Sequence, residues 1–325
     1  MSGSAPRRTR ISTGGRTAND ARRSSVNAVT SVLRLDGVDR SFGDRQVLKN
    51  VSFDVVAGRM TGFVGGNGAG KTTTMRIILG VLAADRGAVS WQGAPLSREA
   101  RRRFGYMPEE RGLYPKMSVR EQVVYLGRLH GLTAEAARRA TDALLERVGL
   151  AERGDDLLET LSLGNQQRAQ IAAALVHDPE VLVLDEPFSG LDPLAVDTVV
   201  AVLRERAAAG VPVLFSSHQL DVVERLCDDL VIIADGAIRA AGDREQLRRT
   251  YTSPRFELVV ETDAGWLRDQ PGVTLVDLDG ARAVFDLAPG TDEQPVLHAA
   301  LTRGPVRAFR PVRPSLTEIF REVAQ

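Results

Sequence analysis

Short apolar runs and amphipathic stretches alternate through the middle of the chain. The runs Val181–Leu184 and Val211–Phe215 are too short for helices and predict strands that are buried on both faces. Apolar residues recur at helical spacing between about Val119 and Gly149, and a further helix is expected from roughly Leu194 to Ala209. Because strands alternate with helices around continuous apolar runs, we expect an α/β fold with a parallel sheet.

The first part of this region has shorter, strand-like patterns. Val32–Leu35 alternates as a strand does, and Gly37–Gly43 is expected to form a turn. Gln46–Val56 predicts two further short strands, and Arg86–Trp91 predicts another. Together with the middle of the chain, these elements predict a domain over residues 31–250.

The composition changes near residue 250, where short alternating segments begin. Two short helices are expected among them, near Trp266 and from Leu297 to Leu301, and a last helix from Ser315 to Val323. The four predicted strands are Phe256–Val260, Val273–Asp277, Ala283–Leu287 and Val306–Phe309. Residues 251–325 are therefore predicted to form a small α+β domain, and we find no catalytic set of side chains in its sequence.

Residues 1–30 differ from the rest of the chain. They are rich in Ser, Thr, Gly and Arg, have Asp20 as their one acidic residue, and contain few apolar side chains. Such a segment cannot bury enough surface to fold, so a disordered basic tail is expected. An inert tail is the simplest interpretation; contact with anionic lipid and a non-native extension from an early start codon are the alternatives.

The overall composition excludes some classes of protein. The chain has 325 residues and a formal net charge of zero, so bulk electrostatics gives no case for nucleic-acid binding. Its one cysteine, Cys227, excludes an intramolecular disulfide and is expected to be a small core residue rather than a reactive thiol. No stretch approaches the ~20 apolar residues of a membrane-spanning helix, so any membrane role is expected to come through a partner.

A glycine-rich loop, Gly65–Thr72, carries the strongest chemical signal. It has the complete spacing G-x-x-x-x-G-K-[ST] and lies between a predicted strand, Met60–Val64, and a helix-like run, Thr73–Leu79. Backbone N–H groups of such a loop wrap a phosphate at a helix N-terminus, while Lys71 supplies a positive charge and Thr72 a hydroxyl for Mg²⁺. An ordinary glycine-rich turn would not need the Lys-Thr pair. The predicted nucleotide contacts from this region are Gly65, Gly66, Asn67, Gly68, Ala69, Gly70, Lys71, Thr72 and Thr73.

Two carboxylates follow the buried strand Val181–Leu184. We expect Asp185 to reach the Mg²⁺ side of the nucleotide, and Glu186 to reach the attacking water as a general base. Apolar strands that end in aspartate are common, so this signal gains its weight from the phosphate loop that precedes it. Metal ligation is therefore predicted for Asp185 together with Thr72.

A second motif, Leu161–Gln167, resembles the signature sequence of ABC-type ATPases, which is usually Leu-Ser-x-Gly-Gln. Asn165 takes the fifth position here. The resemblance implies that Ser162 and Gly164 contact the nucleotide held by the opposite subunit of a dimer, through N–H groups at a helix N-terminus. The alternative is that Ser162 only caps its helix.

Further motifs of this family follow in the same order. Ser189–Pro193 resembles the D-loop, which implies that Asp192 helps to couple the two nucleotide sites. His218 resembles the switch histidine that contacts the terminal phosphate and the catalytic carboxylate. Phe42 matches the aromatic position that stacks on adenine, where tyrosine is frequent, and Val47 is a weaker candidate beside the ribose. A structural role for His218 and core packing for Phe42 are the alternatives.

One position departs from the usual pattern of these ATPases. Glu109 stands where the Q-loop normally carries a glutamine that ligates Mg²⁺. Both side chains offer an oxygen, but glutamate adds a negative charge. The segment Tyr106–Gly112 resembles a variant found in one exporter-type branch, similar to drug-efflux and sodium-efflux ATPases, which also carries a small C-terminal accessory domain. The resemblance to ABC-type ATPases covers roughly residues 31–245.

The resemblance implies a fold and a function. The fold would be a P-loop ATPase core with a parallel sheet, an antiparallel β subdomain and a helical subdomain, followed by the small α+β domain. The chain would be the ATP-binding and ATP-hydrolysing subunit of an ABC transporter, with Lys71, Glu186 and His218 as catalytic residues. A homodimer or pseudo-dimer would bind two Mg·ATP and power export through a separate integral membrane permease, docked near Glu109–Arg120.

The resemblance also implies a location and leaves two rival functions. The subunit would be cytoplasmic and peripheral on the inner face of the plasma membrane, held there by the permease, and no nucleic-acid partner is expected. One rival is an ABC ATPase without a transport role, acting on ribosomes or in DNA repair. The other is a regulatory ATP-binding module with negligible turnover. If the chain is a transporter subunit, the membrane partner rather than this chain would select the substrate.

Overall fold

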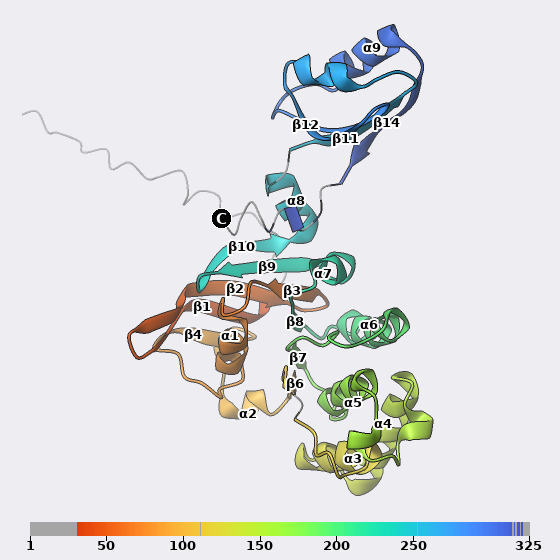
Figure 1. Ribbon diagram of the computed structural model, residues 1–325. Coiled ribbons are helices and arrows are strands. Elements are labelled where there is room, and N and C mark those ends of the chain that lie inside the picture. Colours follow the sequence, from red (N-terminus) through yellow and green to blue (C-terminus); the bar gives the residue numbers. More distant parts are fainter. Residues whose placement is uncertain are drawn as a thin grey trace, which may run out of the picture. The chain divides into compact units, whose positions relative to one another are not determined.

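The computed structural model describes residues 31–110, 112–251, 253–313, 315, 317, 318 and 320 (Figure 1). These residues form three sheets with helices between them. The fold is α/β, as the sequence predicted, and it combines parallel and antiparallel strands. The basic tail predicted over residues 1–30 lies outside the described residues, and the last predicted helix, Ser315–Val323, lies largely outside them.

The central sheet has six strands in the order β10-β9-β3-β8-β7-β6. Their bounds are β3 Met60–Val64, β6 Phe104–Met107, β7 Val181–Leu184, β8 Val213–Ser217, β9 Asp229–Ala234 and β10 Ala237–Asp243. Neighbours from β9 to β6 pair in parallel, and β10 adds an antiparallel edge. The predicted parallel sheet is therefore confirmed, and the carboxyl ends of its strands meet at one edge. The sequence analysis did not predict β6 or the β9-β10 hairpin.

A second sheet is antiparallel and has the order β2-β1-β4-β5. Its strands are β1 Ser31–Phe42, β2 Arg45–Val56, β4 Arg86–Trp91 and β5 Ala94–Pro95. The turn predicted over Gly37–Gly43 is wrong, because β1 continues to Phe42. Gly37 (φ 60°) lies at a register shift within β1, where a glycine accommodates the irregular backbone. The two short strands predicted over Gln46–Val56 are one strand, β2.

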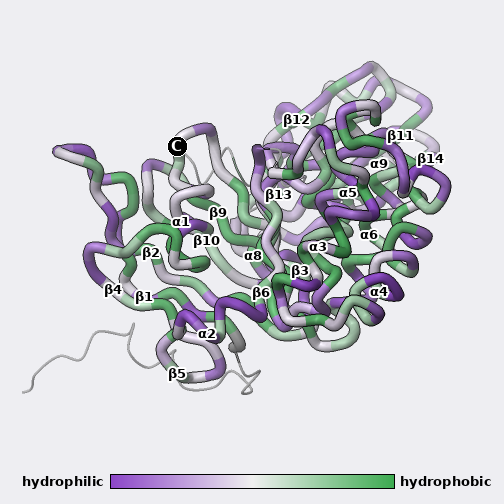
Figure 2. The backbone as a smooth tube through the Cα atoms, turned by 90° about the horizontal axis from the view of Figure 1, so that it is seen from below, coloured by the Kyte–Doolittle hydropathy of each residue, from purple (hydrophilic) through white to green (hydrophobic). Residues whose placement is uncertain are grey.

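Helices follow the strands of both sheets. Their bounds are α1 Lys71–Ile78, α2 Arg98–Arg101, α3 Val119–Leu129, α4 Ala134–Arg147, α5 Leu163–Leu175, α6 Pro193–Ala208, α7 Leu220–Leu226 and α8 Arg244–Tyr251, with short 3-10 turns η1 Ala151–Arg153 and η2 Leu158–Thr160. Helices α3, α4 and α6 confirm the helices predicted from the apolar spacing. Figure 2 shows both hydrophobic and hydrophilic segments along helices such as α3 and α4, each of which buries part of its residues. Among the described residues, no helix is long and apolar enough to cross a bilayer.

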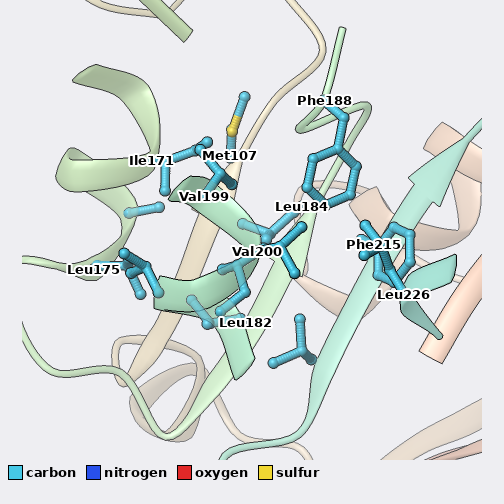
Figure 3. Packing of buried hydrophobic residues seen from close by; sticks show 14 of the residues in the cluster. Met107, Ile171, Leu175, Leu182, Leu184, Phe188, Val199, Val200, Phe215 and Leu226 are labelled. Atoms are coloured by element: carbon cyan, nitrogen blue, oxygen red, sulfur yellow. The ribbon is translucent and has the colours of Figure 1, made fainter. Parts of the chain in front are cut away.

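Alternate residues of the central strands enter two different hydrophobic cores. In β7, Leu182 and Leu184 pack with residues of α5 and α6, whereas Val181 and Val183 pack with α1 and the antiparallel sheet. Figure 3 shows the first of these cores, in which Phe188 and Phe215 meet edge to face with ring centroids 5.5 Å apart. Both faces of the strand are covered, which explains why its sequence is continuously apolar.

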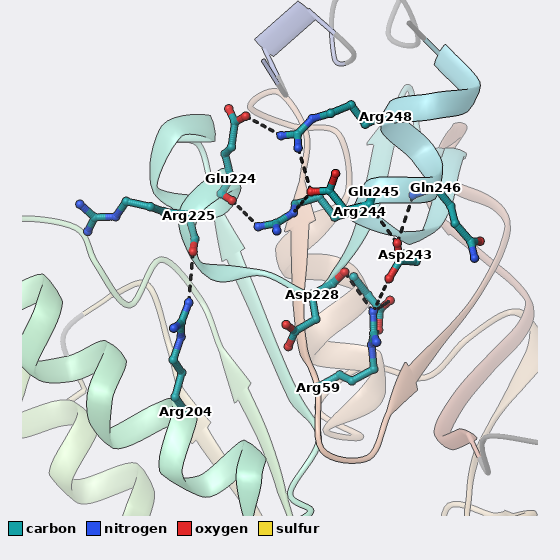
Figure 4. A network of polar contacts seen from close by, with 11 residues as sticks. Arg59, Arg204, Glu224, Arg225, Asp228, Asp243, Arg244, Glu245, Gln246 and Arg248 are labelled. Atoms are coloured by element: carbon teal, nitrogen blue, oxygen red, sulfur yellow. Dashed lines mark hydrogen bonds and ion pairs between the residues drawn. The ribbon is translucent and has the colours of Figure 1, made fainter. Parts of the chain in front are cut away.

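A polar network around Arg59 joins the β2-β3 turn to the β9-β10 hairpin (Figure 4). The Arg59 guanidinium donates to Asp229 at 2.6 Å and to Asp243 at 2.8 Å. The hydrogen bond to Asp229 is the largest cause that raises the pKa of Arg59, so this side chain stays charged. Arg248 of α8 donates to Glu224 of α7 at 2.6 Å. The network therefore holds α7, α8 and the hairpin together at the edge of the central sheet.

The third sheet is antiparallel and has the order β12-β13-β11-β14. Its elements are β11 Arg255–Val260, η3 Gly265–Asp269, β12 Val273–Asp279, β13 Arg282–Leu287, α9 Gln294–Arg303 and β14 Val306–Val312. Phe256 and Phe309 stack with ring centroids 5.3 Å apart and extend the core formed by this sheet. These elements match the predicted strands and short helices. The domain boundary at residue 250 stays a prediction; α8 ends at Tyr251 and β11 begins at Arg255.

The single cysteine is part of the first core. Cys227 is 1% exposed, and burial raises the pKa of its thiol to about 12. A thiol with such a pKa stays protonated at neutral pH and reacts slowly with electrophiles. The structure thus agrees with the prediction of a core residue.

Two histidines stack where helices α3 and α5 end. The rings of His130 and His177 have centroids 3.7 Å apart and are nearly parallel. His177 Nε2 donates to the carbonyl of Phe104 at 3.2 Å, and its neighbour in the chain is Asp178. Burial first, and the adjacent His130 second, lower the pKa of His177 to about 4.

We expect this site to make folding stability depend on pH between about 6.5 and 4. The unfolded chain binds a proton at His177 near the ordinary pKa of 6.5, whereas the folded chain resists protonation down to about 4. The free energy of unfolding should therefore fall as the pH is lowered through this window. Denaturant unfolding of wild type and His177→Asn at several pH values measures it, and the variant should show a shallower fall. Identical pH dependence in both proteins would contradict this role of His177.

Candidate functional site

The glycine-rich loop connects the carboxyl end of β3 to the start of α1. Gly70 precedes the helix in a left-handed conformation (φ 112°), which a residue with a Cβ atom rarely adopts. Lys71 Nζ donates to the carbonyl oxygens of Gly65 at 2.7 Å and Gly66 at 3.3 Å, so the ammonium group is held over the loop. With the unpaired N–H groups of the helix N-terminus, this arrangement offers positive charge and donors to an anion.

Two acidic residues and a histidine lie at the carboxyl ends of β7 and β8. Asp185 is 1% exposed, and among the described residues its Oδ2 atom has no hydrogen-bond partner. Glu186 has a positive φ of 52°, which costs a non-glycine residue about 1–3 kcal/mol. Its carboxylate Oε2 lies 3.0 Å from His218 Nδ1. The pair joins a nearly buried carboxylate to a half-exposed imidazole.

Most of the predicted site residues line one cavity of about 420 Å³. This volume is typical of a ligand site. It is lined by Arg45, Val47, Asn67, Gly68, Ala69, Gly70, Lys71, Thr72, Thr73, Glu109, Asp185, Glu186 and His218. Gly65 does not line it, and Gly66 lines a neighbouring hollow. The sequence analysis did not predict Arg45, although this basic residue lies two positions from the candidate Val47.

Phe42 lies apart from the cavity that Val47 lines. It is the last residue of β1 and is 46% exposed, so it is not a core residue. The guanidinium carbon of Arg40 lies 4.8 Å from the centroid of its ring, in a cation-π contact. The structure therefore places one of the two predicted base and ribose contacts, Val47, in the cavity and leaves Phe42 outside it and partly exposed.

Three other predicted residues also lie outside this cavity. Ser162 caps α5 by accepting a hydrogen bond from the N–H of Asn165 at 3.4 Å, as the capping alternative predicts. A Cβ atom at Gly164 would lie 3.1 Å from the carbonyl oxygen of Gly190, so the glycine permits close packing of these two segments. Asp192 caps α6 through a hydrogen bond from an N–H of its first turn. These contacts fix the three residues but do not bring them to the phosphate loop of their own chain.

Two protein-family models match the sequence. Residues 48–189 match the family described as "ABC transporter", and residues 242–324 match "ATP-binding protein DrrA1-3-like, C-terminal domain". The chain is 37% identical over 291 residues to the uncharacterized ABC transporter ATP-binding protein YhaQ of Bacillus subtilis (strain 168). That match covers 90% of this chain and 98% of the relative. The chain belongs to the family of ABC transporter ATP-binding proteins.

Further comparisons agree with this assignment. The Nod factor export ATP-binding protein I of Burkholderia lata is 39% identical over 236 residues, which cover 72% of this chain and 78% of that protein. A solved structure of the ATP-binding subunit of an ABC transporter has a TM-score of 0.63 and 33% identity, and covers 68% of this chain and 93% of that one. As a member of this family, the chain is an ATP-binding, ATP-hydrolysing subunit of a transporter.

The oxygen atoms of this ABC cassette suit a magnesium ion. The hydroxyl of Thr72 and the carboxylates of Asp185 and Glu109 line the same cavity. A buried carboxylate oxygen without a partner, such as Asp185 Oδ2, costs free energy unless a ligand or water occupies it. Magnesium prefers oxygen ligands and usually takes one or two carboxylates together with phosphate oxygens. The donor set therefore fits a magnesium ion bound with ATP.

Two adjacent glycines of the phosphate loop should respond very differently to alanine. A Cβ atom at Gly65 would lie 2.4 Å from the carbonyl oxygen of Ile233, whereas one at Gly66 would meet nothing within 4 Å. We expect Gly65→Ala to lower the free energy of unfolding by about 1–3 kcal/mol, because the β9 backbone must move. Gly66→Ala is the matched control and should change stability by less than about 0.5 kcal/mol. Thermal or denaturant unfolding without nucleotide measures both, and equal stability would contradict the packing argument.

Proposed function

We propose that this ABC ATPase subunit dimerises around two Mg·ATP and powers export through a separate integral membrane permease. The observation that supports dimerisation is the division of the candidate nucleotide contacts. Lys71, Glu186 and His218 line the cavity, whereas Ser162 and Gly164 lie outside it. In a two-fold symmetric pair, each subunit would supply the second set to the cavity of the other.

The surface around the second set is consistent with a partner subunit. Ser162 is exposed at the start of α5, the next residue Leu163 is 57% exposed, and Leu194 at the start of α6 is 81% exposed. Large apolar side chains at such exposure are suited to contact with another protein surface. Asp192 directly precedes α6 in the chain. On this proposal, it couples the two nucleotide sites across the dimer.

Within one cavity, Glu186 acts as the general base of ATP hydrolysis. Its carboxylate takes a proton from a water molecule as that water attacks the terminal phosphorus, and the bond to the diphosphate leaving group breaks. His218, 3.0 Å from the carboxylate, orients Glu186 and contacts the terminal phosphate. Lys71 and the N–H groups of residues 65–73 offset the negative charge of the phosphates. Phe42 stacks on the adenine, and Val47 packs beside the ribose.

The proposed metal site adds positive charge to this arrangement. Thr72, Asp185 and Glu109 would hold Mg²⁺, which would supply positive charge to offset the charge that develops during phosphoryl transfer. Glu109 contributes a full negative charge where a glutamine is usual. We infer a correspondingly strong electrostatic attraction between this residue and the ion.

Coupling to a permease is proposed for the segment Glu109–Arg120. It follows β6, so it connects directly to the nucleotide cavity through Glu109, and it carries Tyr114, which is 64% exposed. Movement of ATP-site residues would thus be transmitted to this surface. The chain would be held at the inner face of the plasma membrane by that permease. Export is inferred from the relative that is named as a Nod factor export protein.

Glu186→Gln should separate ATP binding from hydrolysis. The amide cannot accept the proton of the attacking water, so turnover should fall by about 10²–10⁴-fold while ATP still binds. Because the dimer opens only after hydrolysis, the variant should accumulate as an ATP-bound dimer. Phosphate release, equilibrium nucleotide binding and light scattering with Mg·ATP measure these three properties.

Two comparisons make this experiment decisive. Glu152→Gln makes the same chemical change at an exposed residue of η1 and should leave all three properties unchanged. The ATP-bound Glu186→Gln dimer should then capture a multi-span membrane protein from solubilised membranes of the host. Capture of ribosomes or DNA instead would contradict the transport role, and full turnover in Glu186→Gln would contradict the assignment of the base.

A further inference from the structure

The backbone of Glu186 stands in a conformation that must be held by its surroundings. Its φ of 52° is in the left-handed region, which L-residues with a side chain seldom occupy. The residue directly follows the metal-site candidate Asp185, at the point where β7 leaves the sheet. If this backbone relaxed, the carboxylate of Glu186 would turn away from His218. The contacts that hold the backbone therefore decide where the carboxylate lies.

Ser216 of β8 makes the first of these contacts. Its hydroxyl accepts a hydrogen bond from the Glu186 N–H at 2.9 Å and donates one to Asp185 Oδ1 at 2.5 Å. The residue is fully buried, at 0% exposure, so water cannot replace either bond. Since Oδ1 accepts this bond, Oδ2 is the oxygen of Asp185 that has no hydrogen-bond partner among the described residues.

Gln167 of α5 makes the second contact, to the carbonyl group of Glu186. Its side-chain Nε2 donates to the Glu186 carbonyl oxygen at 2.9 Å, and the residue is 7% exposed. The N–H of Ser189 also donates to this carbonyl, at 3.2 Å. The N–H and the carbonyl of Glu186 are thus fixed by side chains from two different elements, a strand of the central sheet and the helix that Ser162 caps.

We propose that Ser216 and Gln167 are positioning residues for ATP hydrolysis, and that Ser216 alone serves both the base and the metal site. The inference rests on the functions proposed above for Glu186 and Asp185. Ser216 holds the Glu186 backbone and at the same time occupies Asp185 Oδ1, which leaves Oδ2 as the carboxylate oxygen for the metal. Gln167 holds only Glu186. It also links the base to α5, so a displacement of that helix would move the base of the same chain.

Substitutions of Ser216 and Gln167 should therefore have distinguishable effects on kcat and on the Mg²⁺ requirement. Ser216→Ala should lower kcat by about 10–100-fold and raise the Mg²⁺ concentration needed for half-maximal activity by about tenfold. Gln167→Leu should lower kcat by about tenfold while its Mg²⁺ requirement stays within about twofold of wild type. Neither change should raise the KM for ATP by more than about threefold, because the phosphate loop is intact.

A matched control tests for a general effect of losing a buried hydroxyl. Thr61 lies on β3, the neighbour of β8, is 0% exposed, and its hydroxyl has no hydrogen-bond partner among the described residues. Thr61→Val should leave kcat and the Mg²⁺ requirement unchanged. The Mg²⁺ dependence of ATP binding is also measured at equilibrium by calorimetry, so the metal effect is observed without turnover. If Ser216→Ala does not fold, Ser216→Cys replaces it, because the thiol has similar size but forms weaker hydrogen bonds.

The outcomes separate this inference from the proposed function. A raised Mg²⁺ requirement in the Ser216 variant, with none in Gln167→Leu or Thr61→Val, supports it. Wild-type kcat and Mg²⁺ dependence in the Ser216 variant, while Glu186→Gln has lost turnover, overturn the role of Ser216 and leave Glu186 as the base. Full turnover in Glu186→Gln removes the base itself and this inference with it.

Discussion

The parallel pairing of β3, β8 and β7 is the constraint on which the candidate site depends. Their register places Val64 beside Ser217 and Leu184 beside Phe215, so the three strands end at one edge of the sheet. The phosphate loop, Asp185 and His218 each begin where one of these strands stops. Residues that are far apart along the chain therefore meet without any contact between their side chains being needed to bring them together.

At that same edge, buried polar groups need hydrogen-bond partners. Asp185 and Glu186 leave the sheet inside the protein, where an unpaired polar atom costs about 1–3 kcal/mol. Ser216 and Gln167, from neighbouring elements, form hydrogen bonds with the N–H and carbonyl of Glu186 and with one oxygen of Asp185. Among the described residues, Asp185 Oδ2 stays without a hydrogen-bond partner, and this atom belongs to a residue that lines the cavity proposed to bind ATP. The buried hydrogen bonds therefore select which oxygen of the carboxylate is available to a ligand.

The sequence was informative where one local property determines the structure. The continuously apolar run at Val181–Leu184 predicted a strand buried on both faces, and the spacing of Gly65–Thr72 predicted a phosphate loop before a helix. Both depend on a few adjacent residues, so no distant contact had to be known. The strand β9 was missed, although Leu230–Ile233 carries the same apolar signal as β7 and was sufficient to predict it.

The features that were not predictable depend on contacts between distant parts of the chain. A glycine usually marks a turn, but Gly37 lies inside β1, because pairing with β2 and β4 on both sides continues past it. The left-handed backbone of Glu186 is likewise opposed by local preference and is held by residues 19 and 30 positions away in the sequence. Sequence patterns indicated candidate residues for the chemistry, and most of these line one cavity. On our proposal, the position of Glu186 is set by Ser216 and Gln167. Their part in it was not predictable, although Gln167 ends the motif Leu161–Gln167, because a buried hydroxyl or amide acquires such a role only when folding brings its partners within about 3 Å.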